Sequence, residues 1–186
     1  MLKFIFLLLE QRLLSLPELR EVDWFNNQYA PSEEEEVMYA APAAYLEFLS
    51  ITDLQTEGRK AQKGTVPFRV HVVTELFTDN DNRFKSAALE HYDIVNLVSK
   101  QLLGHSALLS DLPDYAAIQN TPGDQQVYNS VTRTGIIPDH KRSHLMLTVM
   151  DFSTVAIDFS AAKVFTKITP ANPPEITVAL SANLNP

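Results

Sequence analysis

The chain has 186 residues, of which 45% are hydrophobic and 20% charged, and its formal net charge is −8. This length is enough for one sizeable core, and we expect one domain over residues 1–162 followed by a proline-rich extension over 163–186. The acidic balance argues against binding to phosphate backbones, which depends on Lys and Arg. The absence of cysteine excludes disulfides, thiol catalysis and thiolate metal sites.

The chain opens with an apolar run, MLKFIFLLLEQRLL. The run is too short to span a membrane, which needs about 20 apolar residues, and no small-x-small cleavage site of a secretory signal follows it. Its spacing predicts a retained helix of about four turns that ends before Pro17. The stripe expected to face the core is Leu2, Ile5, Leu9, Leu13 and Leu16. Phe4, Leu7 and Leu14 fall on the opposite side, where either other elements or another chain must cover them.

Alternating apolar segments predict strands after this helix. We expect them over 19–25, with Val22 and Trp24 on one face, and over 43–51 and 65–76. The polar stretches 26–42 and 52–64 are predicted to connect them. The first stretch contains Glu33, Glu34, Glu35 and Glu36, four adjacent carboxylates that we expect to be solvated.

The segment RFKSAALEHYDIVNLVSKQLLG predicts the clearest helix, with Gly104 as its stop. Its apolar stripe consists of Phe84, Ala88, His91, Val95, Val98 and Leu102. Further strands are expected over 115–121, 126–135 and 144–160, the last as one or two strands, with a short one at 175–180. This order predicts an α+β fold, with a mostly antiparallel β-sheet and two main helices packed on one face.

The sequence shows no strong catalytic motif and predicts no cofactor or metal. DNDNRFKSAALE begins like a calcium loop, but Arg83 and Phe84 occupy its fifth and sixth positions, so a helix cap is expected instead. His140 and His144 would suit a metal only on a helix, which Pro138 argues against. We therefore expect a polar hairpin tip there.

Further titratable residues bear on catalysis. His91 lies in the apolar stripe, so a buried histidine bonded to a backbone carbonyl or a carboxylate is expected. Asp151 and Asp158 are seven apart, which places them on opposite faces of one continuous strand. A deep pocket lined by His91, Asp151 or His144 would favour an enzyme or ligand-binding protein. The scattered polar residues favour a structural or interaction protein.

Three stretches resemble the tail-terminator and tail-completion proteins of long-tailed bacteriophages and prophages. They are LLEQRLLSLPELREVDWFNNQY, the strand pair AAYLEFLSI and VPFRVHVVTEL, and the helix SAALEHYDIVNLVSKQLLG. The later VTRTGIIPDHKRSHLMLTVMDF is similar to the returning strand pair of such proteins. The likeness covers roughly residues 1–160 and is one of pattern and order. The glutamate stretch and the proline-rich tail have no counterpart in it.

The resemblance implies a non-enzymatic virion component that assembles as a ring, usually of six, at the head-proximal end of the tail tube. Its partners would be copies of itself, tail-tube and head-connector proteins, without nucleic acid or membrane. It would work in the virion and, during assembly, in the bacterial host cytoplasm. Independently of the family, the patterns suggest as ring contacts Phe4, Leu7, Leu14, Glu33, Glu34, Glu35, Glu36, Arg59, Lys60 and Lys63. The alternative function is that of a different α+β protein-interaction module. A small hydrolase or ligand-binding enzyme is the third and least favoured function.

Overall fold

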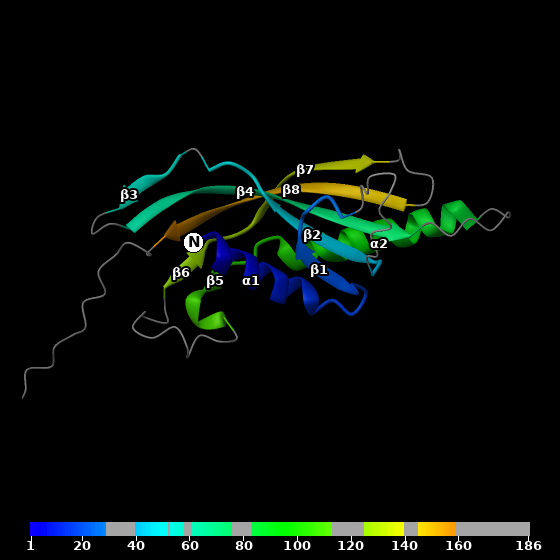
Figure 1. Cartoon of the computed structure of the whole chain (residues 1–186), viewed down its shortest axis with the longest axis horizontal. Coiled ribbons are helices and arrows are strands. Elements are labelled where there is room, and N and C mark those ends of the chain that lie inside the picture. Colours follow the sequence, from blue (N-terminus) through cyan, green and yellow to red (C-terminus); the bar gives the residue numbers. More distant parts are fainter. Residues whose placement is uncertain are drawn as a thin grey trace, which may run out of the picture.

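The computed structural model describes residues 1–28, 40–51, 53–57, 61–75, 83–112, 125–139 and 145–158. In these ranges two helices and a large curled sheet give an α+β fold (Figure 1). The two α-helices are α1 (Leu2–Leu14) and α2 (Arg83–Leu102), and a short 3-10 helix, η1 (Leu109–Asp111), lies beyond them in the chain. The strands are β1 (Glu21–Trp24), β2 (Ala43–Phe48), β3 (Gln55–Glu57), β4 (Ala61–Glu75), β5 (Ala107–Leu108), β6 (Gln126–Tyr128), β7 (Thr132–Asp139) and β8 (Leu145–Asp158).

The sheet is mixed, which corrects the expectation of a mostly antiparallel one. Its strand order is β1-β2-β4-β8-β6-β5, with β3 paired to β4 and β7 paired to β8. β1 runs parallel to β2, whereas the other pairs are antiparallel. A parallel pair needs a connection of about a dozen residues or more, and the chain between residues 25 and 42 supplies it. The strand patterns in the sequence do not determine whether two neighbouring strands run parallel or antiparallel.

The two faces of the sheet carry separate apolar clusters. Val66, Phe68 and Val70 of β4 share the larger cluster with buried residues of α1 and α2, and we call this the helix face. The Phe68 ring stacks on Phe152 of β8, with centroids 5.5 Å apart. The smaller cluster lies on the other face, here called the outer face, and consists of Ala43, Tyr45, Val73, Leu145 and Leu147.

Helix α1 is covered on most of its circumference by its own chain. Ile5, Leu8, Leu9 and Leu13 are buried, while Leu2, Phe4, Phe6 and Leu7 are half-buried and pack against the same cluster. This explains why the helix is apolar nearly all round. Of the three side chains predicted on its far side, only Leu14 is largely exposed, at 53%.

Helix α2 confirms four positions of the predicted stripe, while Ala88 is half-buried and the side chain of Phe84 lies outside the described residues. His91, Val95, Val98 and Leu102 are buried and face the core. Gly104 follows the helix with a φ of +76°, and its N–H donates to the Val131 carbonyl (2.9 Å). A glycine takes this left-handed conformation without the penalty that a Cβ would bring.

Some predicted boundaries differ in the structure. β3 and the start of β4 fall in the stretch expected to be a polar connection, because Gln55–Glu57 pairs with residues 61–63. The predicted strand 126–135 is divided into β6 and β7, and β7 continues through Ile136 and Ile137 into the expected connection. Within the run 144–160, predicted as one or two strands, residues 145–158 form one strand, β8. The strands predicted at 115–121 and 175–180 lie outside the described residues, as does the extension 163–186.

Candidate functional site

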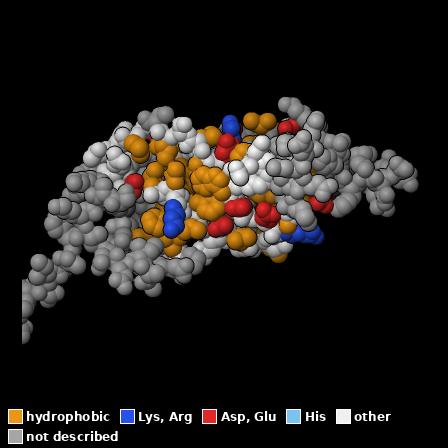
Figure 2. Space-filling model, in the orientation of Figure 1, with side chains coloured by type: hydrophobic (Ala, Val, Ile, Leu, Met, Phe, Trp, Pro, Cys, Tyr) orange, Lys and Arg blue, Asp and Glu red, His pale blue; other side chains and the backbone are white. Residues whose placement is uncertain are grey.

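Aromatic side chains join α1 to the first strands at the surface. Phe6 and Trp24 have ring centroids 5.5 Å apart, and Trp24 and Phe48 lie 5.3 Å apart. Phe6 and Phe48 are half-buried against the core, whereas Trp24 is 44% exposed. Figure 2 shows hydrophobic side chains gathered over α1 and the strands beside it, next to acidic ones. We call Phe6, Trp24 and Phe48 the aromatic surface.

The backbone of Trp24 is held by neighbouring side chains. Its N–H donates to Asp23 Oδ1 (2.6 Å), and its carbonyl accepts from Gln28 Nε2 (2.6 Å). Phe25, the next residue, turns to the outer face, where its ring stacks on that of His71 at 4.1 Å. The strand alternation therefore directs Trp24 towards α1 and Phe25 away from it.

Two carboxylates, Glu10 of α1 and Asp23 of β1, interact electrostatically beside the aromatic surface. Partial burial and the nearby Asp23 raise the pKa of Glu10 above its ordinary value. The surface thus combines an exposed tryptophan with an acidic margin.

The predicted interface residues are dispersed in the structure. Phe4 and Leu7 pack partly into the core, Leu14 is exposed at the end of α1, and Lys63 is half-buried on β4. Glu33, Glu34, Glu35, Glu36, Arg59 and Lys60 lie outside the described residues. Sequence reasoning missed Trp24 as a contact candidate, although the enrichment of tryptophan at interfaces was an available signal.

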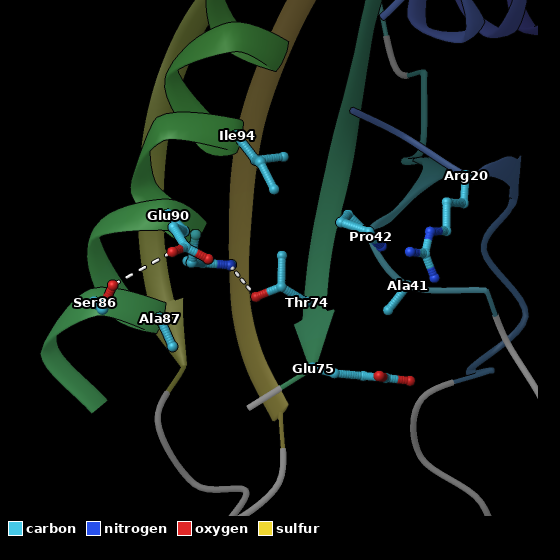
Figure 3. Close-up of a pocket in the computed structure, with 10 residues that line it drawn as sticks. Arg20, Ala41, Pro42, Thr74, Glu75, Ser86, Ala87, Glu90 and Ile94 are labelled. Atoms are coloured by element: carbon cyan, nitrogen blue, oxygen red, sulfur yellow. Dashed lines mark hydrogen bonds between the residues drawn. The ribbon is translucent and has the colours of Figure 1, made fainter. Parts of the chain in front are cut away.

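A cavity of about 510 Å³ lies between α2, the end of β4 and the start of β2 (Figure 3). Its lining consists of Arg20, Ala41, Pro42, Thr74, Glu75, Ser86, Ala87, Glu90, His91 and Ile94. The Ala41–Pro42 peptide bond is cis. Arg20, Glu75 and Glu90 are exposed, so the cavity has a charged rim and an apolar wall.

His91 reaches this cavity from the core. It is 1% exposed, its Nδ1 lies 2.8 Å from Thr74 Oγ1, and its Nε2 lies 2.8 Å from Thr148 Oγ1. The sequence predicts a carbonyl or carboxylate partner, and in the structure two threonine hydroxyls are partners of the ring. Both ring nitrogens are thus engaged by side chains of the sheet. The bonds instead tie α2 to β4 and β8.

The two aspartates considered from the sequence have different partners. Asp151 Oδ1 accepts a bond from Arg69 Nε (2.9 Å), and Asp158 Oδ1 lies 3.8 Å from the N-terminal ammonium group. They are therefore engaged separately and form no acid and base pair. His140, His144, Asp79 and Asp81 lie outside the described ranges. Within those ranges no group of three or more His, Asp or Glu side chains could hold a metal.

Comparison with known proteins assigns no family to this chain. No protein-family model matches the chain, and no curated protein matches it. Among the described residues, neither helix combines the length and apolarity that crossing a membrane requires.

Proposed function

We propose that this chain is a non-enzymatic virion-assembly protein of the tail-terminator type. It forms a homo-oligomeric ring, of six copies in the family that it resembles, at the head-proximal end of a phage tail tube. Its partners are further copies of itself and the tail-tube and head-connector proteins, with neither nucleic acid nor membrane among them. It acts in the virion and, during assembly, in the host cytoplasm.

The observation that carries the proposal is the aromatic surface. Trp24 is 44% exposed between two half-buried phenylalanines, and its backbone is fixed by Asp23 and Gln28. Burying one large apolar side chain contributes about 1.5–3 kcal/mol, and tryptophans at the centre of interfaces dominate binding energies. A neighbouring subunit that covers Trp24 gains this energy with little further ordering.

The proposal includes a finer description of the fold, in which two helices pack on one face of the mixed sheet. One side of such a subunit offers α1 and the aromatic surface. The other side offers the outer face of the sheet. Two different surfaces are what a head-to-tail ring contact requires.

Native mass spectrometry of the full chain over a range of concentrations tests the proposal. Wild-type protein should form a closed oligomer, and Trp24→Ser should raise the dissociation constant by more than about tenfold. Leu89→Ser is the matched control, because Leu89 is an exposed leucine on α2, away from the aromatic surface. Circular dichroism checks that both variants are folded. A wild-type chain that stays monomeric at every concentration would overturn the proposal.

Small-molecule binding in the cavity beside His91 is the second candidate function. The observation that favours it is the cavity of about 510 Å³ with Arg20, Glu75 and Glu90 at its rim. Glu90→Lys would reverse the charge at the rim without touching the core. Ligand screening by thermal shift that finds stabilisation of the wild type but not of Glu90→Lys would support this candidate.

A further inference from the structure

A row of charged side chains crosses the outer face of the sheet. Glu47 of β2, Arg69 of β4 and Asp151 of β8 are direct register partners on neighbouring strands. Arg69 Nε donates to Asp151 Oδ1 (2.9 Å), and Arg69 Nη1 lies 3.6 Å from Glu47 Oε2. The same Glu47 oxygen lies 3.0 Å from His71 Nε2. We call Glu47, Arg69, His71 and Asp151 the charged row.

The charged row has more negative than positive groups. Burial lowers the pKa of His71 below its ordinary value, so the imidazole is neutral at pH 7. Two carboxylates then face one guanidinium. Asp151 and Glu47 remain about a quarter exposed, so a further cation can approach them.

Gly135 extends this row to the edge of the sheet. It is the register partner of Asp151, and a Cβ at this position would lie 2.9 Å from Asp151 Oδ2. A larger residue would therefore press on the carboxylate. Because glycine stands here, Asp151 is reachable from the edge strand.

Strand β7 is an edge with exposed apolar side chains. It pairs with β8 on one side, and no described strand pairs with its other side. Ile136 and Ile137 are 45% and 52% exposed. A β-bulge between Arg133 and Gly135 and a proline at 138 bound this stretch, and both features limit indiscriminate strand pairing.

On the opposite edge of the sheet, some backbone groups already have side-chain partners. On β1, Asp23 and Gln28 occupy the N–H and the carbonyl of Trp24. The short window Gly135–Ile137 is therefore the better place for an added strand. Because this window is short, side chains must supply most of the selectivity.

We propose that the β7 edge at Gly135–Ile137 binds an extended segment of a partner protein that carries an Arg or Lys opposite Gly135. Gly135 and Ile137 both face the outer side, since their register partners are Asp151 and Val149. The cation pairs with Asp151, and an apolar or β-branched residue two positions away packs on Ile137. This partner is cationic where the chain itself is acidic, with its net charge of −8. The site is separate from the aromatic surface and goes beyond the proposed ring contact.

The test uses the full chain and a fluorescein-labelled, capped peptide of sequence TVTRTVTS, with TVTETVTS as its charge-reversed counterpart. Fluorescence anisotropy should show binding of the first peptide and binding at least about tenfold weaker for the second. Asp151→Asn and Ile137→Lys should each weaken binding of the first peptide to a similar degree. Increasing salt should weaken it as well.

Matched controls keep the test decisive. Leu89→Lys places the same charge on an exposed leucine of α2 and should leave peptide binding unchanged. Trp24→Ser should also leave it unchanged, so a failure of the ring proposal is distinguishable from a failure here. If Asp151→Asn fails to fold, Gly135→Ala and Ile137→Lys carry the test.

Three outcomes would overturn the inference. The first is equal binding of both peptides, and the second is no binding of either. The third is self-association that Ile137→Lys abolishes, since β7 would then bind a second copy of this chain.

Discussion

At the residue scale, His91 shows how a buried polar group connects separate elements. Its ring is bonded to Thr74 on β4 and Thr148 on β8 from within α2. His91→Ala would leave a cavity and remove a partner from two buried hydroxyls. We expect a loss of about 2–4 kcal/mol in the free energy of unfolding, measured by urea denaturation.

The neighbouring Glu90 supplies the control for this prediction. It is exposed and bonded only weakly to Ser86 (3.3 Å), so Glu90→Ala should change stability by less than about 0.5 kcal/mol. If His91→Ala were as stable as the wild type, the histidine would have no structural role. That result would favour a functional role of His91 in the cavity.

His71 provides a prediction about pH. Burial lowers its pKa despite the contact with Glu47, so between the folded pKa and about 6.5 the unfolded chain binds more protons. Stability therefore rises with pH in this window and is lost as the pH falls through it. His71→Gln should flatten the slope of unfolding free energy against pH between about pH 5 and 7.

Denaturation curves across that range measure the slope. Burial also lowers the pKa of His105. Part of the slope of unfolding free energy against pH should therefore remain in His71→Gln, and it should be smaller still in the double variant with His105→Gln. An unchanged slope in His71→Gln would mean that this imidazole titrates alike in both states.

The environment of some of these residues could be predicted from the sequence and that of others could not, for a physical reason. The burial of His91 follows from helical spacing within one segment. The charged row depends on the register between strands far apart in the chain, where Glu47, Arg69 and Asp151 become neighbours. Local periodicity contains no information on that register.

At the element scale, the end of α2 depends on Gly104. Its φ of +76° is unfavourable for other residues, while a Cβ added at this glycine would have no heavy atom within 4 Å. Gly104→Ala should therefore cost about 1 kcal/mol through backbone strain alone, measured by thermal or chemical unfolding. Gly104→Asn should cost less, because asparagine tolerates this conformation better. Equal losses in both variants would point to a cause other than φ.

The long elements were predictable and the short ones were not. α1, α2, β4 and β8 carry periodic patterns over many residues, whereas β3 is three residues long and polar. It forms because β4 continues beyond its apolar part and offers an edge for pairing. The parallel β1–β2 pair likewise depends on how the chain crosses between strands, which propensities do not determine.

At the scale of the whole molecule, α1 shows how the fold changes an argument about assembly. The sequence left open whether other elements or another chain cover Phe4, Leu7 and Leu14. The structure packs Phe4 and Leu7 partly against the core and leaves Leu14 exposed. The interface role of all three remains a prediction, but the expected effects of changing them now differ.

The last prediction separates stability from assembly on this helix. Phe4→Ser with Leu7→Ser removes partly buried surface, so we expect it to lower the free energy of unfolding by about 2 kcal/mol or more. Leu14→Ser with Trp24→Ser removes side chains that are 53% and 44% exposed, so it should weaken self-association more than it lowers stability. Urea denaturation and native mass spectrometry on both double variants measure the two effects. If Phe4→Ser with Leu7→Ser dissociated the oligomer while the monomer kept its stability, α1 itself would be the ring contact. The aromatic surface would then lose its central place in the proposed assembly.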